Sequence, residues 1–463
     1  MHTIIDLENK TYKIFHSIYL YLFLSIFIIV GWSLNNEIVT TVGIISFTLG
    51  IVLLQFDMRL IGLLGMLVLM SVSKLPSFDS VSVLLITNIS IVLGALVLLV
   101  IKNIVFKRIK WSFGSIGFSL IILILTFLIS SIVNVSVRYG KYSNYGLLVS
   151  LICFAFVILY FSLLTCSKKG DGFIAKEFYI INIVAIVELA IFFIRNHTIQ
   201  TYVNLGWVEK NILAMVFEFC IPFMALIFAK NLKRIDALML LLADYAAITI
   251  ISSRGGIITI AILTVLVAYI LTTKSRSRFK YTFVYMSVII AVFVIAIAFP
   301  SAFRDSLVSL INRGSDVSGR DQIWSTAMDY FKLNPFVGSS FQGLFELADD
   351  LPQYSHQSAD GIVMLFCHNT FITLLATGGI LSLLAYLFHI FELGYITFKQ
   401  KDEYRPVLLY IVLFGLIHGL IDNTFFSIAY MIPYIMIFAD PDLHSFSDEV
   451  LFKLFRKGNS LKS

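Results

Sequence analysis

The sequence has 463 residues, of which 59% are hydrophobic and 13% are charged. Soluble domains carry about 25% charged residues, so this composition excludes a soluble protein. The net charge of +6 is explained by basic residues at membrane edges and gives no reason to expect a nucleic-acid partner. Apolar runs of roughly 20 residues recur throughout and are too long and uniform for barrel strands. The sequence therefore predicts an all-α polytopic membrane protein with about fourteen transmembrane helices and one large extracytoplasmic loop.

The apolar runs are bounded by charged or turn-forming residues, which sets their approximate limits. In chain order they cover residues 14–34, 38–56, 59–74, 82–101, 114–133, 146–165, 176–195, 210–229, 235–251, 254–272, 281–299, 367–396, 405–421 and 424–440. Basic residues concentrate in alternate connections between these runs, and such connections face the cytoplasm. The pattern predicts that both termini are cytoplasmic and that the long polar segment 300–367 is extracytoplasmic. The first run has no small-residue cleavage site and is expected to stay as a signal anchor.

The four cysteines offer no disulfide framework and no cysteine-based metal site, because none of them forms a close pair in the sequence. They are Cys153, Cys166, Cys220 and Cys367. Ionisable residues inside the predicted spans, such as Glu188, Asp244 and His389, are candidate functional residues, because a charged group inside a membrane is costly. They are scattered over different spans, and Asp244 is of most interest because it lies about ten residues before Arg254.

The short segment Ser252–Gly256 separates two predicted spans on the extracytoplasmic side. Serine is a common helix N-cap, and the glycines Gly255 and Gly256 allow close backbone approach. A helix N-terminus combined with the Arg254 guanidinium makes an anion site suited to phosphate. The alternative is a tight turn whose arginine reaches the lipid head groups.

The segment 300–367 is predicted to contain an amphipathic helix from Asp321 to Leu333, ended by Asn334-Pro335. Its apolar face is formed by Ile323, Trp324, Ala327, Met328 and Phe331. Such a helix would lie on the membrane surface or on the spans as a lid. Arg320 opens this helix, where its charge opposes the helix dipole, which suggests an external anionic partner. Pairing with Asp316 or Asp321 is the alternative.

His368 and Asn369 begin the next predicted span, and a neutral histidine there can accept a proton or orient a hydroxyl. A polar interface residue is the alternative for His368. The acidic residues between 346 and 360 could act as metal ligands with His356, but their spacing matches no compact metal motif. A solvated loop surface is the favoured interpretation of this stretch.

In order and spacing, these motifs resemble the O-antigen ligase and polymerase superfamily. The resemblance covers roughly residues 240–390 and rests on Ser253-Arg254-Gly255-Gly256, Gly319-Arg320 with Trp324, Asn334-Pro335-Phe336-Val337-Gly338, His368-Asn369-Thr370 and Gly378-Gly379. It implies a helical bundle of the GT-C kind. The chain would then comprise an N-terminal bundle (1–234), a ligase/polymerase-like core (235–440) and a cytoplasmic tail (441–463).

The resemblance also implies an activity, namely transfer of a glycan from undecaprenyl diphosphate to an acceptor hydroxyl outside the bacterial cytoplasmic membrane. The catalytic residues would be Arg254, Arg320 and His368. No metal or other cofactor is implied. The substrate-binding residues would be Ser253, Gly255, Asn369 and Trp324, with Arg195 and Arg138 as further candidates.

The expected function is an O-antigen or capsule polymerase, because the polymerases of the superfamily are variable and the N-terminal half of this chain is divergent. A ligase that transfers the glycan to lipid A core or another acceptor is the main alternative. A polysaccharide flippase is a third, although the large loop and the lack of repeat symmetry disfavour it. A chain-length regulator would be a possible partner.

Overall fold

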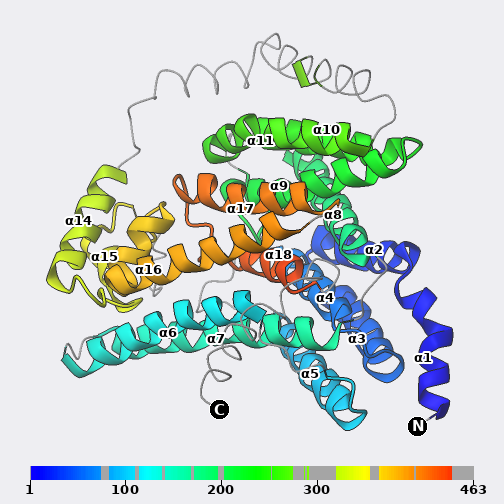
Figure 1. Ribbon diagram of the computed structural model, residues 1–463, viewed down its shortest axis with the longest axis horizontal. Helices are drawn as coiled ribbons and strands as arrows, with labels where there is room; N and C mark the ends of the chain where they lie inside the picture. The colour runs from blue at the N-terminus through cyan, green and yellow to red at the C-terminus, as the bar shows by residue number, and fades with distance from the viewer. Residues whose placement is uncertain are drawn as a thin grey trace, which may run out of the picture. The chain divides into compact units, whose positions relative to one another are not determined.

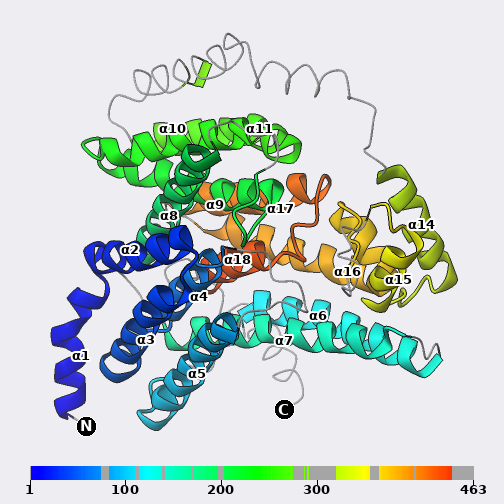
Figure 2. The ribbon, with the colours of Figure 1, turned by 180° about the vertical axis from the view of Figure 1, so that it is seen from behind.

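The computed structural model describes residues 2–73, 83–109, 114–137, 141–167, 172–196, 203–251, 253–274, 286, 289–290, 320–354, 364–400 and 403–440. Within these ranges the chain forms helices, with one isolated bridge between Asn204 and Glu209 and no strand. The helices are α1 (His2–Phe15), α2 (Ile18–Leu34), α3 (Glu37–Leu54), α4 (Arg59–Met70), α5 (Val83–Val105), α6 (Gly114–Val137), α7 (Ser143–Cys166), α8 (Phe173–Asn196), α9 (Lys210–Lys230), α10 (Ile235–Ile250), α11 (Arg254–Lys274), α14 (Arg320–Leu333), α15 (Gln342–Asp350), α16 (Thr370–Lys399), α17 (Arg405–Gly419) and α18 (Ile428–Ala439). Figures 1 and 2 show them from opposite sides.

Eight of these helices are long and apolar enough to cross a membrane, and α1 with α2 forms a ninth candidate that bends by 59°. Three further apolar helices, α4, α17 and α18, are shorter than a bilayer is thick. Each expected run coincides with a described helix, except for 281–299, which lies almost wholly outside the described residues. The polytopic all-α class is confirmed, and the total of about fourteen spans stays a prediction.

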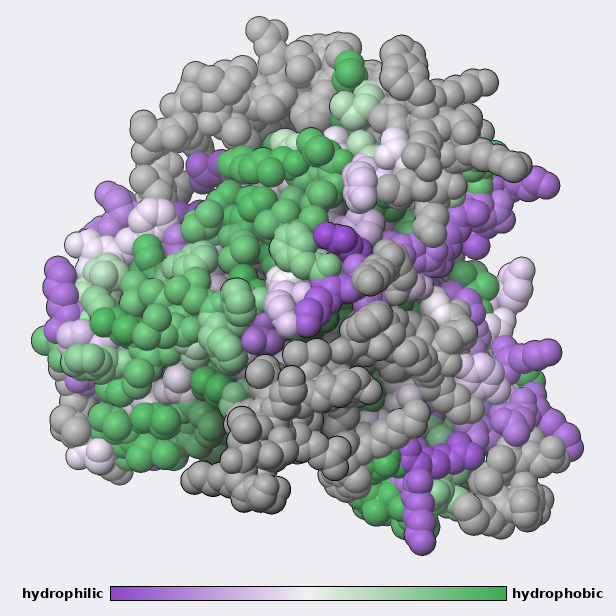
Figure 3. All heavy atoms as spheres, in the orientation of Figure 1, coloured by the Kyte–Doolittle hydropathy of each residue, from purple (hydrophilic) through white to green (hydrophobic). Residues whose placement is uncertain are grey.

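The lipid-facing character of the helices is visible in their side chains. On α5, Leu93, Val97 and Ile101 are each at least half exposed and recur every fourth residue, so they form one apolar stripe. Leu96 and Leu99, on the opposite side of the helix, are buried. Figure 3 shows apolar side chains gathered over much of the described surface, as expected for helices that contact lipid.

By packing, the chain divides into two compact units, each formed by separate segments of the chain and described here by itself. The first comprises residues 1–110, 165–312 and 427–442, and the second comprises 111–164, 313–426 and 443–463. In the first unit α9 is almost entirely buried and packs against α8, α10, α11 and α18. The rings of Phe178 on α8 and Phe223 on α9 stack with their centroids 4.5 Å apart. Helix α9 is therefore the central helix of this unit.

The second unit is built around α16, which packs against α6, α14, α15 and α17. The predicted amphipathic helix is present as α14, with Ile323 and Ala327 buried, and it ends at Leu333 before Asn334-Pro335 as expected. Instead of lying as a loose cover, α14 packs along α16 and α15. The segment predicted as one long loop is therefore partly helical and integral to this unit.

Helix α16 is interrupted at Gly379, whose φ of 63° and ψ of −159° are not helical. An interruption removes internal hydrogen bonds, which is costly in a membrane helix unless other groups replace them. Residues 335–340 supply these groups. The N–H groups of Ser339 and Ser340 donate to the carbonyls of Ala376 and Thr377, at 2.7 and 2.8 Å.

Hydrogen bonds also run from α16 back to this loop. The N–H groups of Ile380 and Leu381 donate to the carbonyls of Pro335 and Phe336, at 2.9 and 3.2 Å. The loop and the two halves of α16 therefore satisfy one another's backbone groups. This gives the Asn334–Gly338 motif and the Gly378-Gly379 pair one shared structural role.

We call the contact between residues 335–340 and the break in α16 at Gly379 the joint. Glycine is required on both sides of it. A Cβ at Gly338 (φ 65°) would lie 2.6 Å from the backbone nitrogen of Gly379, and a Cβ at Gly379 would lie 2.5 Å from the carbonyl carbon of Phe336. Both positions also have the positive φ that disfavours other residues.

We expect Gly338→Ala and Gly379→Ala each to destabilise the protein by more than about 1–3 kcal/mol, because the steric clash adds to the strain of positive φ. The matched control is Gly394→Ala on the same helix, where an added Cβ meets nothing within 4 Å; it should be neutral or slightly stabilising. The measurement is the melting temperature of the purified protein in detergent. Equal melting temperatures for all three variants would contradict this account of the joint.

Candidate active site

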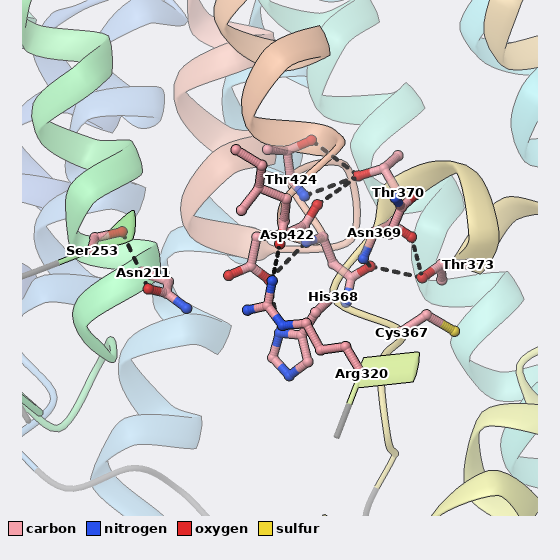
Figure 4. A network of polar contacts seen from close by, with 12 residues as sticks. Asn211, Ser253, Arg320, Cys367, His368, Asn369, Thr370, Thr373, Asp422 and Thr424 are labelled. Atoms are coloured by element: carbon pink, nitrogen blue, oxygen red, sulfur yellow. Dashed lines mark hydrogen bonds and ion pairs between the residues drawn. The ribbon is translucent and has the colours of Figure 1, made fainter. Parts of the chain in front are cut away.

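The N-terminus of α16 is held by a network of polar contacts with the turn that follows α17 (Figure 4). Asn369 is the N-cap, and its side-chain oxygen accepts hydrogen bonds from the N–H groups of Phe371 and Ile372, at 2.9 and 3.1 Å. Its side-chain nitrogen donates to the carbonyl of Leu420 at 3.0 Å. Asn423 accepts from the backbone N–H of Asn369 at 3.2 Å. The two segments are thus fastened together at several points.

His368 lies directly before this cap and has a positive φ of 47°. This conformation is uncommon for a residue other than glycine, and such strain often accompanies function. Its ring nitrogen Nδ1 is 3.1 Å from Oδ1 of Asp422. The histidine side chain is 40% exposed and the aspartate 11%. No described residue makes a hydrogen bond with the other ring nitrogen, Nε2.

The protonation state of Asp422 decides what His368 can do. Burial by itself would raise the pKa of the Asp422 carboxyl, but the hydrogen bond and charge of His368, the charge of His418 and the N–H of Asn423 lower that pKa to about 2. When the ring of His368 is neutral, an ionised Asp422 carboxylate accepts a hydrogen bond from Nδ1–H, and Nε2 is then free to accept a proton. The pair therefore presents a base with a fixed tautomer.

Arg320 is the first residue of α14 and reaches the same turn. Its Nη1 donates to the carbonyl of Ile421 at 2.7 Å. Because Ile421 and Asp422 are consecutive, the guanidinium of Arg320 and the ring of His368 lie next to each other, as Figure 4 shows. The structure thus brings together two of the three predicted catalytic residues.

Trp324, a predicted substrate-binding residue, lies one turn further along α14. Its indole N–H donates to the carbonyl of Cys367 at 2.6 Å, which fixes the residue before His368. The N–H of Leu365 donates to the carbonyl of Leu344 on α15 at 3.0 Å. The residues that precede His368 in the chain are therefore held by both α14 and α15. Trp324 positions the histidine whether or not its ring contacts a substrate.

The described acidic residues of the 346–360 stretch have structural partners in this unit. Asp349 accepts from the hydroxyl of Tyr142 at 2.8 Å, Asp350 accepts from the hydroxyl of Tyr330, and Glu346 accepts from the side chain of Gln342 at 2.7 Å. His356 and Asp360 lie outside the described residues. Asp350 thus attaches α15 to α14, and Asp349 attaches it to the residue before α7, whereas the Glu346 bond lies within α15.

Asp422 and Asn423 were not singled out from the sequence. The only signal was their position: they fall between two predicted spans, on the same predicted side as His368. A single aspartate at the end of an apolar run is common at membrane surfaces, so the pairing with a residue 54 positions away is visible only in the structure.

The predicted Ser253–Gly256 turn belongs to the first unit and forms the N-terminus of α11. The buried hydroxyl of Ser253 accepts the N–H of Gly256 at 3.3 Å, so Ser253 is the expected cap, and it donates to Oδ1 of Asn211 at 3.2 Å. A Cβ at Gly256 would lie 3.0 Å from Cβ of Ala214 on α9, so this glycine lets α11 approach α9. Arg254, half-buried, is the first residue of the helix, followed by the buried Gly255. Ser252 lies outside the described residues.

For two further arginines that were predicted to bind substrate, the structure gives less support to that role. Arg195, in the last turn of α8, donates to the backbone and side-chain oxygens of Ser33 at the end of α2. Arg138 lies outside the described residues. Their predicted role in substrate binding stays a prediction.

Two of the ionisable groups inside spans make hydrogen bonds to neighbouring helices, although Oδ1 of Asp244 has no partner among the described residues. Asp244 accepts from the side chain of Asn182 at 3.0 Å, and Nδ1 of His389 is 2.7 Å from the hydroxyl of Ser119. These contacts lie within one unit each. Hydrogen bonding of this kind is what a polar group buried among apolar helices requires.

The second unit can therefore supply an oriented base and a guanidinium, and the first can supply a capped helix N-terminus with an arginine. A base beside a guanidinium suits activation of a hydroxyl next to an anion. A helix N-terminus with an arginine suits phosphate.

Comparison with known families gives an independent result. Residues 237–387 match the family model described as O-antigen ligase. No curated protein was found to match the chain. The matched segment contains Arg254, Arg320 and His368, whereas Asp422 lies beyond its end. The resemblance seen in the motifs is thereby confirmed: residues 237–387 are a domain of the O-antigen ligase and polymerase superfamily, a group of glycosyltransferase-like membrane enzymes.

Proposed function

We propose that the protein is a polysaccharide polymerase, which joins undecaprenyl-diphosphate-linked oligosaccharide repeats on the outer face of the bacterial cytoplasmic membrane. The observation that carries this proposal is the His368–Asp422 pair beside Arg320. It offers a proton acceptor for a sugar hydroxyl and a cation for a diphosphate within one small region of the second unit.

The reaction is a substitution at the anomeric carbon of the donor. The acceptor hydroxyl oxygen forms the new bond to that carbon while the bond from the carbon to the diphosphate oxygen breaks. The hydroxyl proton passes to Nε2 of His368, and the leaving group is undecaprenyl diphosphate. Asp422 stabilises the imidazolium that results and keeps the ring oriented. Direct displacement would invert the anomeric centre.

The leaving diphosphate gains negative charge as the bond breaks. Arg320 is assigned to stabilise this charge, because a preoriented guanidinium costs no reorganisation during the reaction. Its own anchor, the carbonyl of Ile421, sets the position of the guanidinium. Arg254 is assigned to the donor by its chemistry alone, since it opens a capped helix that favours anions.

We favour the polymerase over the ligase because the N-terminal half of the chain resembles the superfamily only in being polytopic, and the polymerases are its more variable members. The ligase remains the second candidate, since it uses the same donor and similar motifs.

Deleting the gene tests this choice through the products that accumulate. Loss of a polymerase should leave single repeats on the acceptor or carrier. Loss of a ligase should leave long chains on the lipid diphosphate instead. Gel analysis of the cell-envelope glycan distinguishes the two outcomes. A cell that still makes both the long chains and their final conjugate would contradict both functions.

Arg320→Ala and Arg254→Ala should each lower the rate of glycan transfer by on the order of 100–1000-fold, the typical cost of removing one electrostatic contact to a transition state. The control is Lys332→Ala at the far end of α14, where the lysine is exposed and pairs only with Asp329 among the described residues. It should keep the wild-type rate. The assay follows conversion of a lipid-linked repeat by purified protein, and a wild-type rate in either arginine variant removes that residue from the mechanism.

His368→Ala should lower the rate by on the order of 100–10,000-fold, the usual contribution of a general base. Asp422→Asn should also be strongly impaired, because an amide no longer fixes the ring tautomer. If the two act as one unit, the double variant will be no slower than His368→Ala. Losses that multiply in the double variant would show that Asp422 acts independently of His368.

A further inference from the structure

The side chain of Asn423, in the turn that follows α17, is held by the start of α16. Its oxygen Oδ1 accepts the hydroxyl proton of Thr373 at 2.7 Å and the backbone N–H of Asn369 at 3.2 Å. The same hydroxyl lies 2.9 Å from the carbonyl of Asn369. Both Thr373 and Asn423 are buried, so breaking one of these bonds would leave a buried polar atom with fewer partners. Asn423 therefore has a fixed place against α16.

The residues on either side of Asn423 are also held by α16 (Figure 4). The hydroxyl of Thr370 donates to the carbonyl of Asp422 at 3.2 Å and accepts the N–H of Thr424 at 3.1 Å. Thr370 and Thr373 lie three residues apart and therefore share one face of the helix. Residues 422–424 are thus held along their whole length by the first turn of α16.

These contacts reach the candidate base through a single carboxylate oxygen. The backbone N–H of Asn423 donates to Oδ1 of Asp422 at 2.8 Å. The same Oδ1 lies 3.1 Å from Nδ1 of His368. The carboxylate cannot turn away from the histidine without also losing the N–H of Asn423, whose position depends on the side-chain bonds of that residue. Thr373, Asn423, Asp422 and His368 therefore form one chain of contacts.

The orientation of Asp422 decides which ring nitrogen of a neutral His368 carries the proton. A neutral imidazole has one ring N–H, and the hydrogen bond made by one nitrogen sets which of the two holds it. With Asp422 in place, the proton stays on Nδ1 and Nε2 is the acceptor. If Asp422 could turn away, some of the molecules would carry the proton on Nε2 and could not accept a second one there.

We propose that Asn423 is a positioning residue for the base: held by Thr373, it orients Asp422 so that the neutral ring of His368 keeps its proton on Nδ1. Its consequence for glycan transfer rests on the proposed function, whereas the tautomer is a property of the protein without substrate. Asn423 lies beyond residues 237–387, the segment that matches the family model.

The first experiment measures the tautomer directly. Nuclear magnetic resonance of the purified full-length protein, with isotope-labelled histidine ring nitrogens and at a pH at which the rings are neutral, distinguishes a protonated Nδ1 from a protonated Nε2. The signals of His368 are those that disappear in His368→Gln. Wild type should show the proton on Nδ1 alone. Thr373→Val, which keeps the shape of the side chain and removes its hydroxyl, should show a mixture of both tautomers, and so should Asn423→Ala.

The second experiment follows transfer of a lipid-linked repeat by the same proteins. Thr373→Val should lower kcat by on the order of tenfold, part of the usual contribution of a general base, and leave KM unchanged, because the base acts in the transition state. Thr373→Ser keeps the hydroxyl and should restore both kcat and the tautomer. The matched control is Thr326→Val on α14, where the hydroxyl bonds the carbonyl of Gln322 in its own helix; it should behave as wild type does.

Each outcome decides between the alternatives. A single Nδ1 tautomer in both Thr373→Val and Asn423→Ala overturns the positioning role, and so does a loss of kcat that Thr326→Val shows equally. If neither Thr373→Val nor Asn423→Ala folds, the two residues serve the fold as a whole and the proposal fails. A wild-type protein that transfers no glycan overturns the proposed function, while the tautomer measurement still decides the role of Asn423.

Discussion

A membrane helix can be interrupted only where other groups replace its missing hydrogen bonds, and this constraint governs the second unit. At Gly379 the replacement comes from residues 335–340, which exchange four backbone hydrogen bonds with the two halves of α16. The exchange fixes the end of α14 against α16. Arg320 at the start of α14 and His368 before α16 thereby belong to two elements that share one joint. The position of the candidate site depends on this backbone arrangement as much as on its side chains.

Within the second unit, each polar residue around the candidate site holds a different part of it in place. Asn369 and Asn423 fasten the start of α16 to the turn after α17, Asp422 holds one nitrogen of His368, and Trp324 holds the residue before it. The backbone of His368 is strained, so its position is imposed by its surroundings. A carboxylate, an imidazole and a guanidinium held in this way suit the proton transfer and charge stabilisation proposed for them.

Much of this could be predicted from the sequence, because the signals were local. Apolar runs located the helices, the 3.6-residue periodicity of Asp321–Leu333 located α14, and Ser253 was recognisable as a cap. Motif order indicated Arg254, Arg320 and His368. These inferences need only neighbouring residues and helix geometry.

The contributions that escaped prediction depend on tertiary contacts. Asp422 carries no periodic or motif signal, and its importance arises only from a contact with a residue 54 positions earlier. The Asn334–Gly338 motif was recognisable, but its role in completing a broken helix required the φ angle of Gly379 and the bonds around it.

The joint at Gly379 also limits how far α14 can move. To shift its C-terminal end away from α16, the chain would have to withdraw residues 335–340 and leave four backbone bonds broken at once, at about 1–3 kcal/mol for each buried group left unsatisfied. That motion is too costly to occur in every catalytic cycle. The C-terminal end of α14 is therefore a fixed attachment, and the helix that begins with Arg320 stays anchored to α16 in the absence of any substrate.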